Sequence, residues 1–129
     1  MEMTMPAYNF QSRFVPMILD GSKPHTIRRR RKRPTKVGDV IKMFVGMRTK
    51  SCFQFGEAPC MKVEPIVIYP FEQRMLINGE FLLRKEELLI IRDDGFEVME
   101  DFYDFFKRYK RECLDDFEII WWEWNEMPR

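Results

Sequence analysis

The sequence has little of what several classes of protein need. Its 129 residues include three cysteines and one histidine, His25. A structural zinc site normally takes four Cys or His ligands at close spacings, whereas Cys52 and Cys60 lie eight residues apart with no Cys-x-x-Cys pair. The odd cysteine count without a secretory signal indicates reduced thiols, most of which we expect to be buried. We therefore expect no metal and no other cofactor.

Long apolar runs are also missing. No run approaches the roughly 18 residues of a membrane span, and the opening "MEMTMPAYNF" lacks the basic-then-apolar pattern of a signal peptide. We expect a soluble, cytoplasmic protein with no membrane partner. Hydrophobic residues make up 45% of the chain, which supplies a core and argues against disorder. With no repeat or linker, residues 1–129 are predicted to form a single domain.

Charge is unevenly distributed along the chain, although the net charge is only +1. Residues 1–62 carry 13 Lys and Arg against 4 Asp and Glu, and residues 63–129 carry 9 against 17. Such polarity is typical of a basic binding face, although the two halves could instead neutralise each other across the fold. The densest part is "RRRRKR", Arg28 to Arg33.

Periodicity and turn residues predict an α+β fold. Helices are expected over 12–20, 85–92 and 96–110, and strands over 25–29, 39–46, 50–55 and 61–69, with a last strand over 116–126. Asn78-Gly79 between apolar runs predicts a type I′ hairpin, and Pro65 predicts an edge or a bulge. We expect five to seven strands to form a small mixed or antiparallel β-barrel with flanking helices.

Four stretches resemble the ASCH family of small PUA-like barrels: "ILDGSKPHTIR", "KVGDVIKMFVG", "RDDGF" and the final "EIIWWEW". The resemblance covers about residues 10–124. It implies a PUA-like β-barrel with a cleft that binds RNA or a modified nucleoside or nucleotide. A bacterial branch of the family, similar in length, hydrolyses the acetyl amide of acetylcytidine with a lysine, a threonine and a glutamate. By motif position these match Lys23, Thr26 and Asp94, so that aspartate stands where the branch has glutamate.

Each candidate catalytic residue has a functional and a structural interpretation. Lys23 would be the nucleophile or base once a desolvated cleft and Arg28 lower its pKa, or else an exposed lysine that touches phosphate. Thr26 would steady an oxyanion, or simply be a β-branched strand residue. Asp94 would protonate the leaving amine, or cap a helix through the box Asp94-x-x-Glu97. These alternatives leave two functions open, a binding module and an amidohydrolase.

The basic run has its own alternatives. Arg28 follows Thr26 by two residues on the predicted strand, so both side chains share a face and would meet at the cleft. The remaining residues, Arg29, Arg30, Arg31, Lys32 and Arg33, would line the rim and contact phosphate. A solvated loop and a nuclear-import signal are the competing interpretations. His25 is interpreted mainly as a packed or surface histidine, with a catalytic role as the alternative. The tryptophans Trp121, Trp122 and Trp124 are interpreted mainly as core residues, with base stacking as the alternative. A nuclease is disfavoured by the single histidine and the lack of an acidic cluster.

Overall fold

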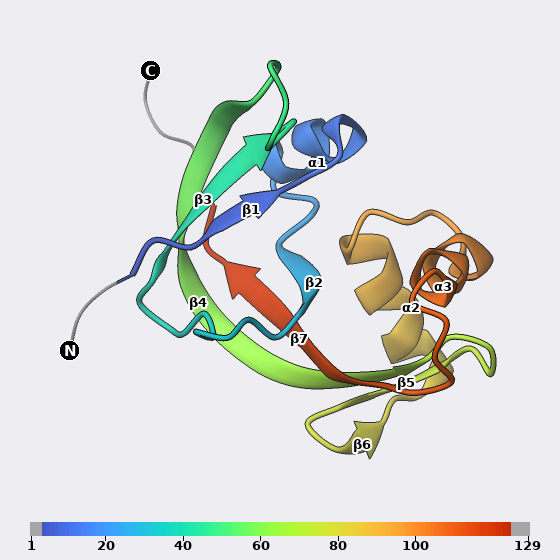
Figure 1. The fold of residues 1–129 in the computed structure, drawn as a ribbon. Helices are drawn as coiled ribbons and strands as arrows, with labels where there is room; N and C mark the ends of the chain where they lie inside the picture. Colours follow the sequence, from blue (N-terminus) through green and yellow to red (C-terminus); the bar gives the residue numbers. More distant parts are fainter. Residues whose placement is uncertain (1–3, 125–129) are drawn as a thin grey trace.

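The structure, a computed structural model, describes residues 4–124 and mixes strands and helices as the α+β prediction requires (Figure 1). The strands are β1 (Ala7–Asn9), β2 (His25–Arg29), β3 (Val40–Val45), β4 (Phe53–Tyr69), β5 (Arg74–Ile77), β6 (Glu80–Phe81) and β7 (Leu114–Trp122). The helices are α1 (Val15–Leu19), preceded by the 3-10 turn η1 (Ser12–Phe14), α2 (Arg84–Asp93) and α3 (Met99–Lys107). No helix in this part of the chain is long and apolar enough to cross a membrane.

The strand β4 organises the sheet. It is 17 residues long and curves through the molecule (Figure 1). Its first part pairs with β3, its middle with β7 and its end with β5, in each case antiparallel. The short β1 runs parallel to β3, and β2 runs antiparallel to β7. The pairing path therefore runs β1-β3-β4-β7-β2, with β5 and β6 as a branch.

The seven-stranded sheet does not close into a barrel. Within residues 4–124, β1 and β2 end the path without pairing to each other. Arginine side chains occupy the free edge of β1 instead: Arg28 Nη2 donates to the Asn9 carbonyl at 2.6 Å, and Arg31 Nη2 donates to the Ala7 carbonyl. These carbonyls, two residues apart, point to the same edge of the strand. The guanidinium groups thus satisfy acceptors that a closing strand would have used, and they blunt the edge.

Local sequence signals account for most of the elements. The predicted strand 25–29 is confirmed as β2. The residues of the predicted hairpin turn, Asn78 and Gly79, have φ of 54° and 81°, the pair of positive angles that a type I′ turn requires. The two strands expected over 50–55 and 61–69 are wrong as separate elements, because β4 runs through both. Pro65 lies inside β4, and the register with β7 shifts just after it, between Ile66 and Ile68.

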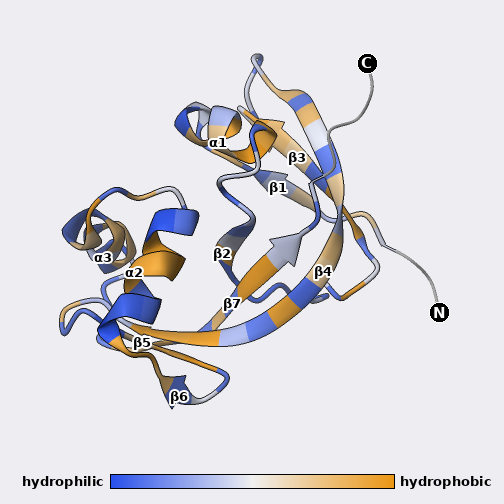
Figure 2. Cartoon of the chain, turned by 180° about the vertical axis from the view of Figure 1, so that it is seen from behind, coloured by the Kyte–Doolittle hydropathy of each residue, from blue (hydrophilic) through white to orange (hydrophobic). Residues whose placement is uncertain are grey.

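The last helix is shorter than the predicted 96–110. It begins at Met99, so Phe96 precedes it in the irregular segment between α2 and α3. Phe96 is nevertheless buried, and its ring meets that of Phe102 edge-on at 5.5 Å. With Phe106, also buried, these rings anchor α3 in the core. Along β4, hydrophobic and hydrophilic segments alternate, in keeping with a strand that is buried on one face (Figure 2).

The tryptophans and the cysteines differ in how deeply they are buried. Trp122 is buried edge-on against Phe10, as the core interpretation requires, while Trp121 is half-buried. The three cysteines are free, as expected. Cys60 is buried as predicted, whereas the expectation of burial is wrong for Cys52, which is exposed.

Candidate functional site

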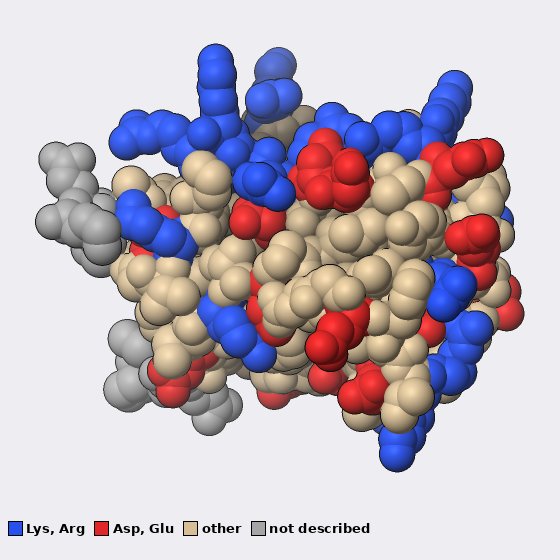
Figure 3. All heavy atoms as spheres, turned by 90° about the horizontal axis from the view of Figure 1, so that it is seen from below, with Lys and Arg blue, Asp and Glu red and all other residues tan. Residues whose placement is uncertain are grey.

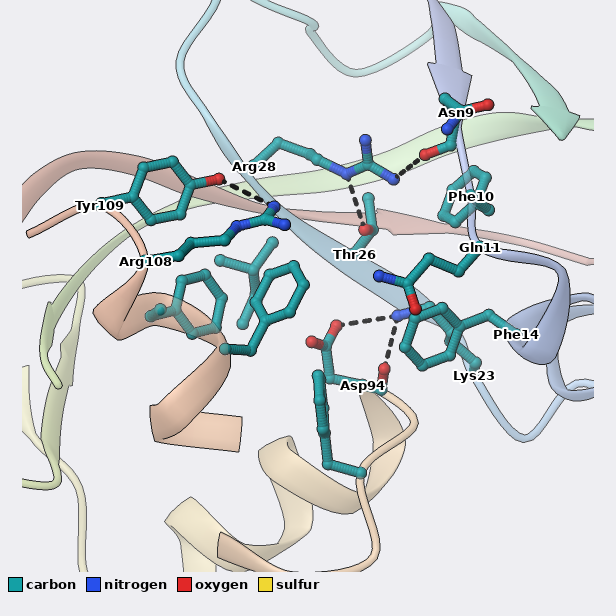
Figure 4. Close-up of a pocket in the computed structure, with 14 residues that line it drawn as sticks. Asn9, Phe10, Gln11, Phe14, Lys23, Thr26, Arg28, Asp94, Arg108 and Tyr109 are labelled. Atoms are coloured by element: carbon teal, nitrogen blue, oxygen red, sulfur yellow. Dashed lines mark hydrogen bonds and ion pairs between the residues drawn. The ribbon is translucent and has the colours of Figure 1, made fainter. Parts of the chain in front are cut away.

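A cleft of about 250 Å³ lies where β1, η1, β2, α3 and the turn after α2 meet (Figure 4). Its polar lining consists of Asn9, Gln11, Lys23, Thr26, Arg28, Asp94 and Arg108, and its aromatic lining consists of Phe10, Phe14, Phe96, Phe105, Phe106 and Tyr109. The structure therefore brings the three sequence-predicted catalytic residues and Arg28 into one cavity. The aromatic groups on its walls come from segments that are distant in sequence.

Lys23 and Asp94 form an ion pair at the base of this cleft. Lys23 Nζ donates to Asp94 Oδ1 at 3.0 Å and to the Asp94 backbone carbonyl at 2.6 Å. The two residues are only 2% and 5% exposed. Isolated charges are very costly to bury, so burial at this depth requires that each charge be paired and hydrogen-bonded. The pair supplies both requirements for Lys23.

The electrostatics of the pair follow from burial and from neighbouring charges. Burial lowers the pKa of Lys23 by more than the attraction of Asp94 raises it, and Arg28 and Arg13 lower it further. Burial would raise the pKa of Asp94, but Lys23 and His25 together outweigh it and hold that pKa below its usual range. The cleft thus contains an ionised carboxylate beside an ammonium group that loses its proton more readily than in water.

The position of Asp94 corrects one structural prediction. Asp94 does not cap the following helix, because α3 begins at Met99 with Val98 at the N-cap position. It lies at the C-terminal cap of α2, where its N–H bonds to the Ile90 carbonyl. Gly95 follows with φ of 103° and passes so close to Phe14 that an added Cβ would lie 2.6 Å from the ring. The α2 terminus and Gly95 therefore turn the carboxylate toward Lys23.

His25 is a site residue that sequence reasoning underestimated. It is fully buried, and its Nδ1 lies 3.3 Å from Asp94 Oδ1, the same oxygen that Lys23 contacts. Its ring meets Trp121 edge-on at 4.4 Å. Lys23 and His25 are two residues apart in an extended segment, which places their side chains on one side. That spacing was a signal for their proximity, but nothing local indicated that Asp94 would face them.

Thr26 and Arg28 form the upper part of the cleft, on the shared strand face that was predicted (Figure 4). Arg28 Nε donates to Thr26 Oγ1 at 3.1 Å. The threonine oxygen accepts this bond, so its own hydrogen remains available for a ligand. Arg28 also lies over the Phe10 ring, 4.7 Å from its centre. The guanidinium is thus held in a fixed position at the cleft.

The rest of the basic run lies partly beside β7 and partly along a second groove. Arg29 faces away toward β7, where its Nε lies 3.2 Å from Asp116 Oδ2. Arg30 is exposed, and its N–H bonds to the Asp116 carbonyl. Arg31, Lys32 and Arg33 line a second, wider groove of about 710 Å³. Lys and Arg side chains gather along one margin of the face shown in Figure 3.

Other residues of the cleft had no signal, or a different one, in the sequence. Tyr109 continues the three-and-four spacing of apolar residues in the predicted helix 96–110, a pattern that predicts a core position. Asn9, Gln11 and Arg108 carried no motif. In Figure 4, the Gln11 amide points into the middle of the cavity, while Arg108 and Tyr109 close the side opposite to it. These residues come together only through the packing of α3 against β2 and η1.

Comparison with family models, with curated proteins and with solved structures finds no significant match to this chain. In residues 4–124, no group of three or more His, Cys, Asp or Glu side chains is arranged to hold a metal ion.

Proposed function

We propose that the chain is a PUA-like domain of the ASCH type whose cleft binds the nucleoside part of RNA or of a nucleotide. The observation that carries this proposal is the buried Lys23–Asp94 pair at the base of an open cavity. A hydrophobic pair of similar volume would be at least as stabilising at such a position. Perturbed, paired charges in a cleft are typical of functional sites.

The lining of the cleft has the chemistry that a nucleobase needs. Lys23 supplies N–H donors, Asp94 supplies acceptors and the Thr26 hydroxyl supplies either, as recognition of a base edge requires. Rings of Phe14 and Tyr109 line the same cavity and offer surfaces for stacking. At about 250 Å³ the cavity lies below the usual range for drug-sized ligands, which favours a ligand as small as one nucleoside.

Phosphate would be held at the mouth of the cleft. Arg28 and Arg108 both line it, and they lie on the same side in Figure 4. A guanidinium group binds phosphate through paired N–H donors in a planar fork. Arg28 is already fixed by Thr26 and the Asn9 carbonyl, so little additional ordering is needed when a ligand binds.

The ASCH assignment is supported by where the motif residues lie. Thr26, Ile27 and Arg28 occupy β2 beside the cleft, and Gly38 and Asp39 immediately precede β3. The strand path β1-β3-β4-β7-β2 has the order of an opened barrel whose end strands are bridged by arginine side chains. We propose that this open form is a variant of the PUA-like barrel.

Calorimetric titration with the four ribonucleosides, their monophosphates and acetylcytidine tests the binding proposal. The variant is Lys23→Met with Asp94→Asn, which removes both charges and leaves neither unpaired. The matched control is Lys107→Met with Asp104→Asn, an ion pair of 2.9 Å on the surface of α3. We expect the cleft variant to lose about tenfold or more in affinity, from charge-assisted bonds worth about 1.5–3 kcal/mol each, and the control to bind like wild type. Equal binding by both variants, or no binding by wild type, would overturn the proposal.

A second candidate function, amide hydrolysis on an acylated cytidine, is favoured by one observation. Lys23, Thr26 and Asp94 line the same cavity, and the pKa of Lys23 is lowered by burial. A neutral Lys23 would take a proton from water as the oxygen adds to the acyl carbon, and Thr26 would donate to the developing oxyanion. The carbon–nitrogen bond then breaks, the acid is released, and the amine leaves with a proton.

The source of the proton for the leaving amine distinguishes the two functions. Asp94 is held ionised by Lys23 and His25, so it can protonate the amine only after it has received the proton that Lys23 took from water. Lys23 Nζ also donates hydrogen bonds to the carbonyl and the carboxylate of Asp94. The resting geometry is thus an ion pair rather than a free base, and we rank binding above hydrolysis.

A chromatographic hydrolysis assay over acylated nucleosides tests the second candidate. Wild type, Lys23→Ala and Asp94→Glu are compared, the last because it restores the longer side chain that the resemblance implies. Hydrolysis requires product formation by wild type or by Asp94→Glu and its loss in Lys23→Ala. If wild type and Asp94→Glu both leave acetylcytidine and related amides intact while still binding nucleosides, the hydrolase is excluded and the binding module stands.

A further inference from the structure

Beside the cleft lies a second basic groove that a single nucleoside would not fill. This groove, of about 710 Å³, is lined by residues 4–6 and 31–36. Its cationic side chains are Arg31, Lys32, Arg33 and Lys36. Among residues 4–124, only Lys36 of these four side chains forms an ion pair with a carboxylate, with its Nζ 3.9 Å from Asp39 Oδ1. The groove therefore concentrates positive charge beyond the reach of the ligand proposed above.

The loop that carries this charge is held at two points. The Arg31 guanidinium lies over the Tyr8 ring, 3.9 Å from its centre, and donates to the Ala7 carbonyl. Four residues later, the hydroxyl groups of Thr35 and Tyr8 share a buried hydrogen bond of 2.6 Å. Lys32 and Arg33 lie between these anchors and are exposed. A charge run that merely avoided the core would need no such attachment, whereas a preorganised surface loses less entropy on binding.

Tyr8 also connects the groove to the cleft. The centre of its ring lies 5.2 Å from the guanidinium carbon of Arg28, which lines the cleft, and 3.9 Å from that of Arg31, which lines the groove. The two guanidinium groups donate to carbonyls two residues apart on the same edge of β1. Positive charge therefore extends from the cleft to the groove along the edge of β1.

We propose that the groove binds the phosphate backbone of a single-stranded nucleic acid while one nucleoside of the same strand occupies the cleft. The inference rests on the proposed function and narrows its ligand from a free nucleotide to a polymer. The cleft would bind the nucleoside of a mononucleotide, and Arg28 and Arg108 would bind its phosphate. A strand that extends past Tyr8 would bring phosphates to Arg31, Lys32 and Arg33, as happens along the basic tracks beside base-binding pockets in single-strand binding proteins.

The test compares Lys32→Ala with Arg33→Ala, made together, against Lys50→Ala with Lys85→Ala, which removes the same charge at exposed positions outside the groove. Binding of a fluorescein-labelled RNA of about 12 nucleotides is followed by anisotropy between about 50 and 200 mM salt. Loss of two phosphate contacts should weaken binding about tenfold at low salt and flatten the salt slope by about 1.4. Titration with cytidine monophosphate in parallel should give the wild-type affinity for both double variants.

The outcomes separate this inference from the function on which it rests. Unchanged RNA affinity and salt slope in the groove variant, with mononucleotide binding intact, would overturn the track and leave the cleft proposal standing. Groove-dependent RNA binding without any mononucleotide or nucleoside binding would overturn the cleft proposal, and with it the placement of a nucleoside in the cleft, and would leave only the phosphate contacts of the groove. A polyphosphate of matched length that competes as well as the RNA would show a general polyanion site, such as one for an acidic protein segment, and would overturn the nucleic-acid assignment.

Discussion

Lys23 and Asp94 are 71 residues apart in sequence, yet the Lys23 ammonium donates to both the carbonyl and the carboxylate of Asp94. One residue precedes β2 and the other ends α2, so this contact ties the sheet to the helices. The pair therefore has a structural role, whatever binds in the cleft. Each partner makes the burial of the other tolerable, and the two should behave as a unit.

We expect strong coupling when the pair is mutated. Lys23→Met alone leaves a buried carboxylate, and Asp94→Asn alone leaves a buried ammonium, so each should lower the free energy of unfolding by about 3–5 kcal/mol. The double variant should cost clearly less than the sum of the two, as measured by urea unfolding. For the exposed Lys107–Asp104 pair the same cycle should give a coupling below about 1 kcal/mol. Additive costs at Lys23 and Asp94 would contradict the ion pair.

Gly95 should resist even the smallest side chain. An added Cβ would lie 2.6 Å from the Phe14 ring, at a φ of 103° that favours glycine. We expect Gly95→Ala to destabilise the protein by about 2–4 kcal/mol, combining backbone strain with steric overlap. Gly79→Ala is the matched control, because its φ is also positive but no atom lies within 4 Å of the added Cβ. Equal losses in thermal unfolding would show that the contact with Phe14 is unimportant.

Much of the fold could be predicted because its signals are local. The alternation in "HTIRR" and the Asn78-Gly79 turn determine backbone geometry within a few residues, and both predictions are confirmed. Where a tertiary contact determines the position of a residue, local sequence patterns did not predict it. Phe96 continues the three-and-four spacing of the apolar residues in α3, yet it lies before the helix in an irregular segment, where it packs against Phe14 and Phe102. Likewise, the predicted barrel does not close, and arginine side chains rather than a neighbouring strand bond to the free edge of β1.

The candidate site divides in the same way. Strand alternation predicted that Thr26 and Arg28 share a face, and they are hydrogen-bonded. The approach of Asp94 to Lys23 could be expected only from the motif resemblance, since no local spacing links residues so far apart. His25 was interpreted mainly as a packed or surface residue, and it is buried beside the carboxylate of Asp94. Arg108 lines the cleft only because of the docking angle of α3, which no short pattern encodes.

The cysteines should differ sharply in reactivity. Cys52 is exposed, whereas burial raises the pKa of the Cys60 thiol to about 11. Because the thiolate is the reactive form, a thiol reagent at about pH 8 should modify Cys52 quickly and Cys60 only after unfolding. The variants Cys52→Ser and Cys60→Ser assign the phases. If Cys60→Ser removes the fast phase, the burial of this thiol is wrong.

Asp39 should make stability depend on pH in the acid range. Its carboxylate is fully buried, and it accepts from the Thr4 N–H at 3.2 Å and the Lys36 N–H at 3.0 Å. Burial would raise the pKa of Asp39, but these bonds and the Lys36 charge outweigh it, so the pKa is lowered. A group whose folded pKa is depressed adds stability above its unfolded pKa of about 3.9, and that stability is lost as pH falls through the folded pKa.

The variant Asp39→Asn should therefore be less stable than wild type at neutral pH and approach it in acid. An amide has one acceptor oxygen where the carboxylate has two, so one backbone N–H loses its partner, at a cost of about 1–3 kcal/mol at pH 7. Urea unfolding from pH 7 down to about pH 2.5 follows the difference, which should shrink below the unfolded pKa of about 3.9. Asp115→Asn, at an exposed position of β7, is the control and should track wild type throughout. A difference for Asp39→Asn that stays constant in acid would mean that the charge of this carboxylate contributes nothing, and that Asp39 anchors Thr4 and Lys36 through its shape alone.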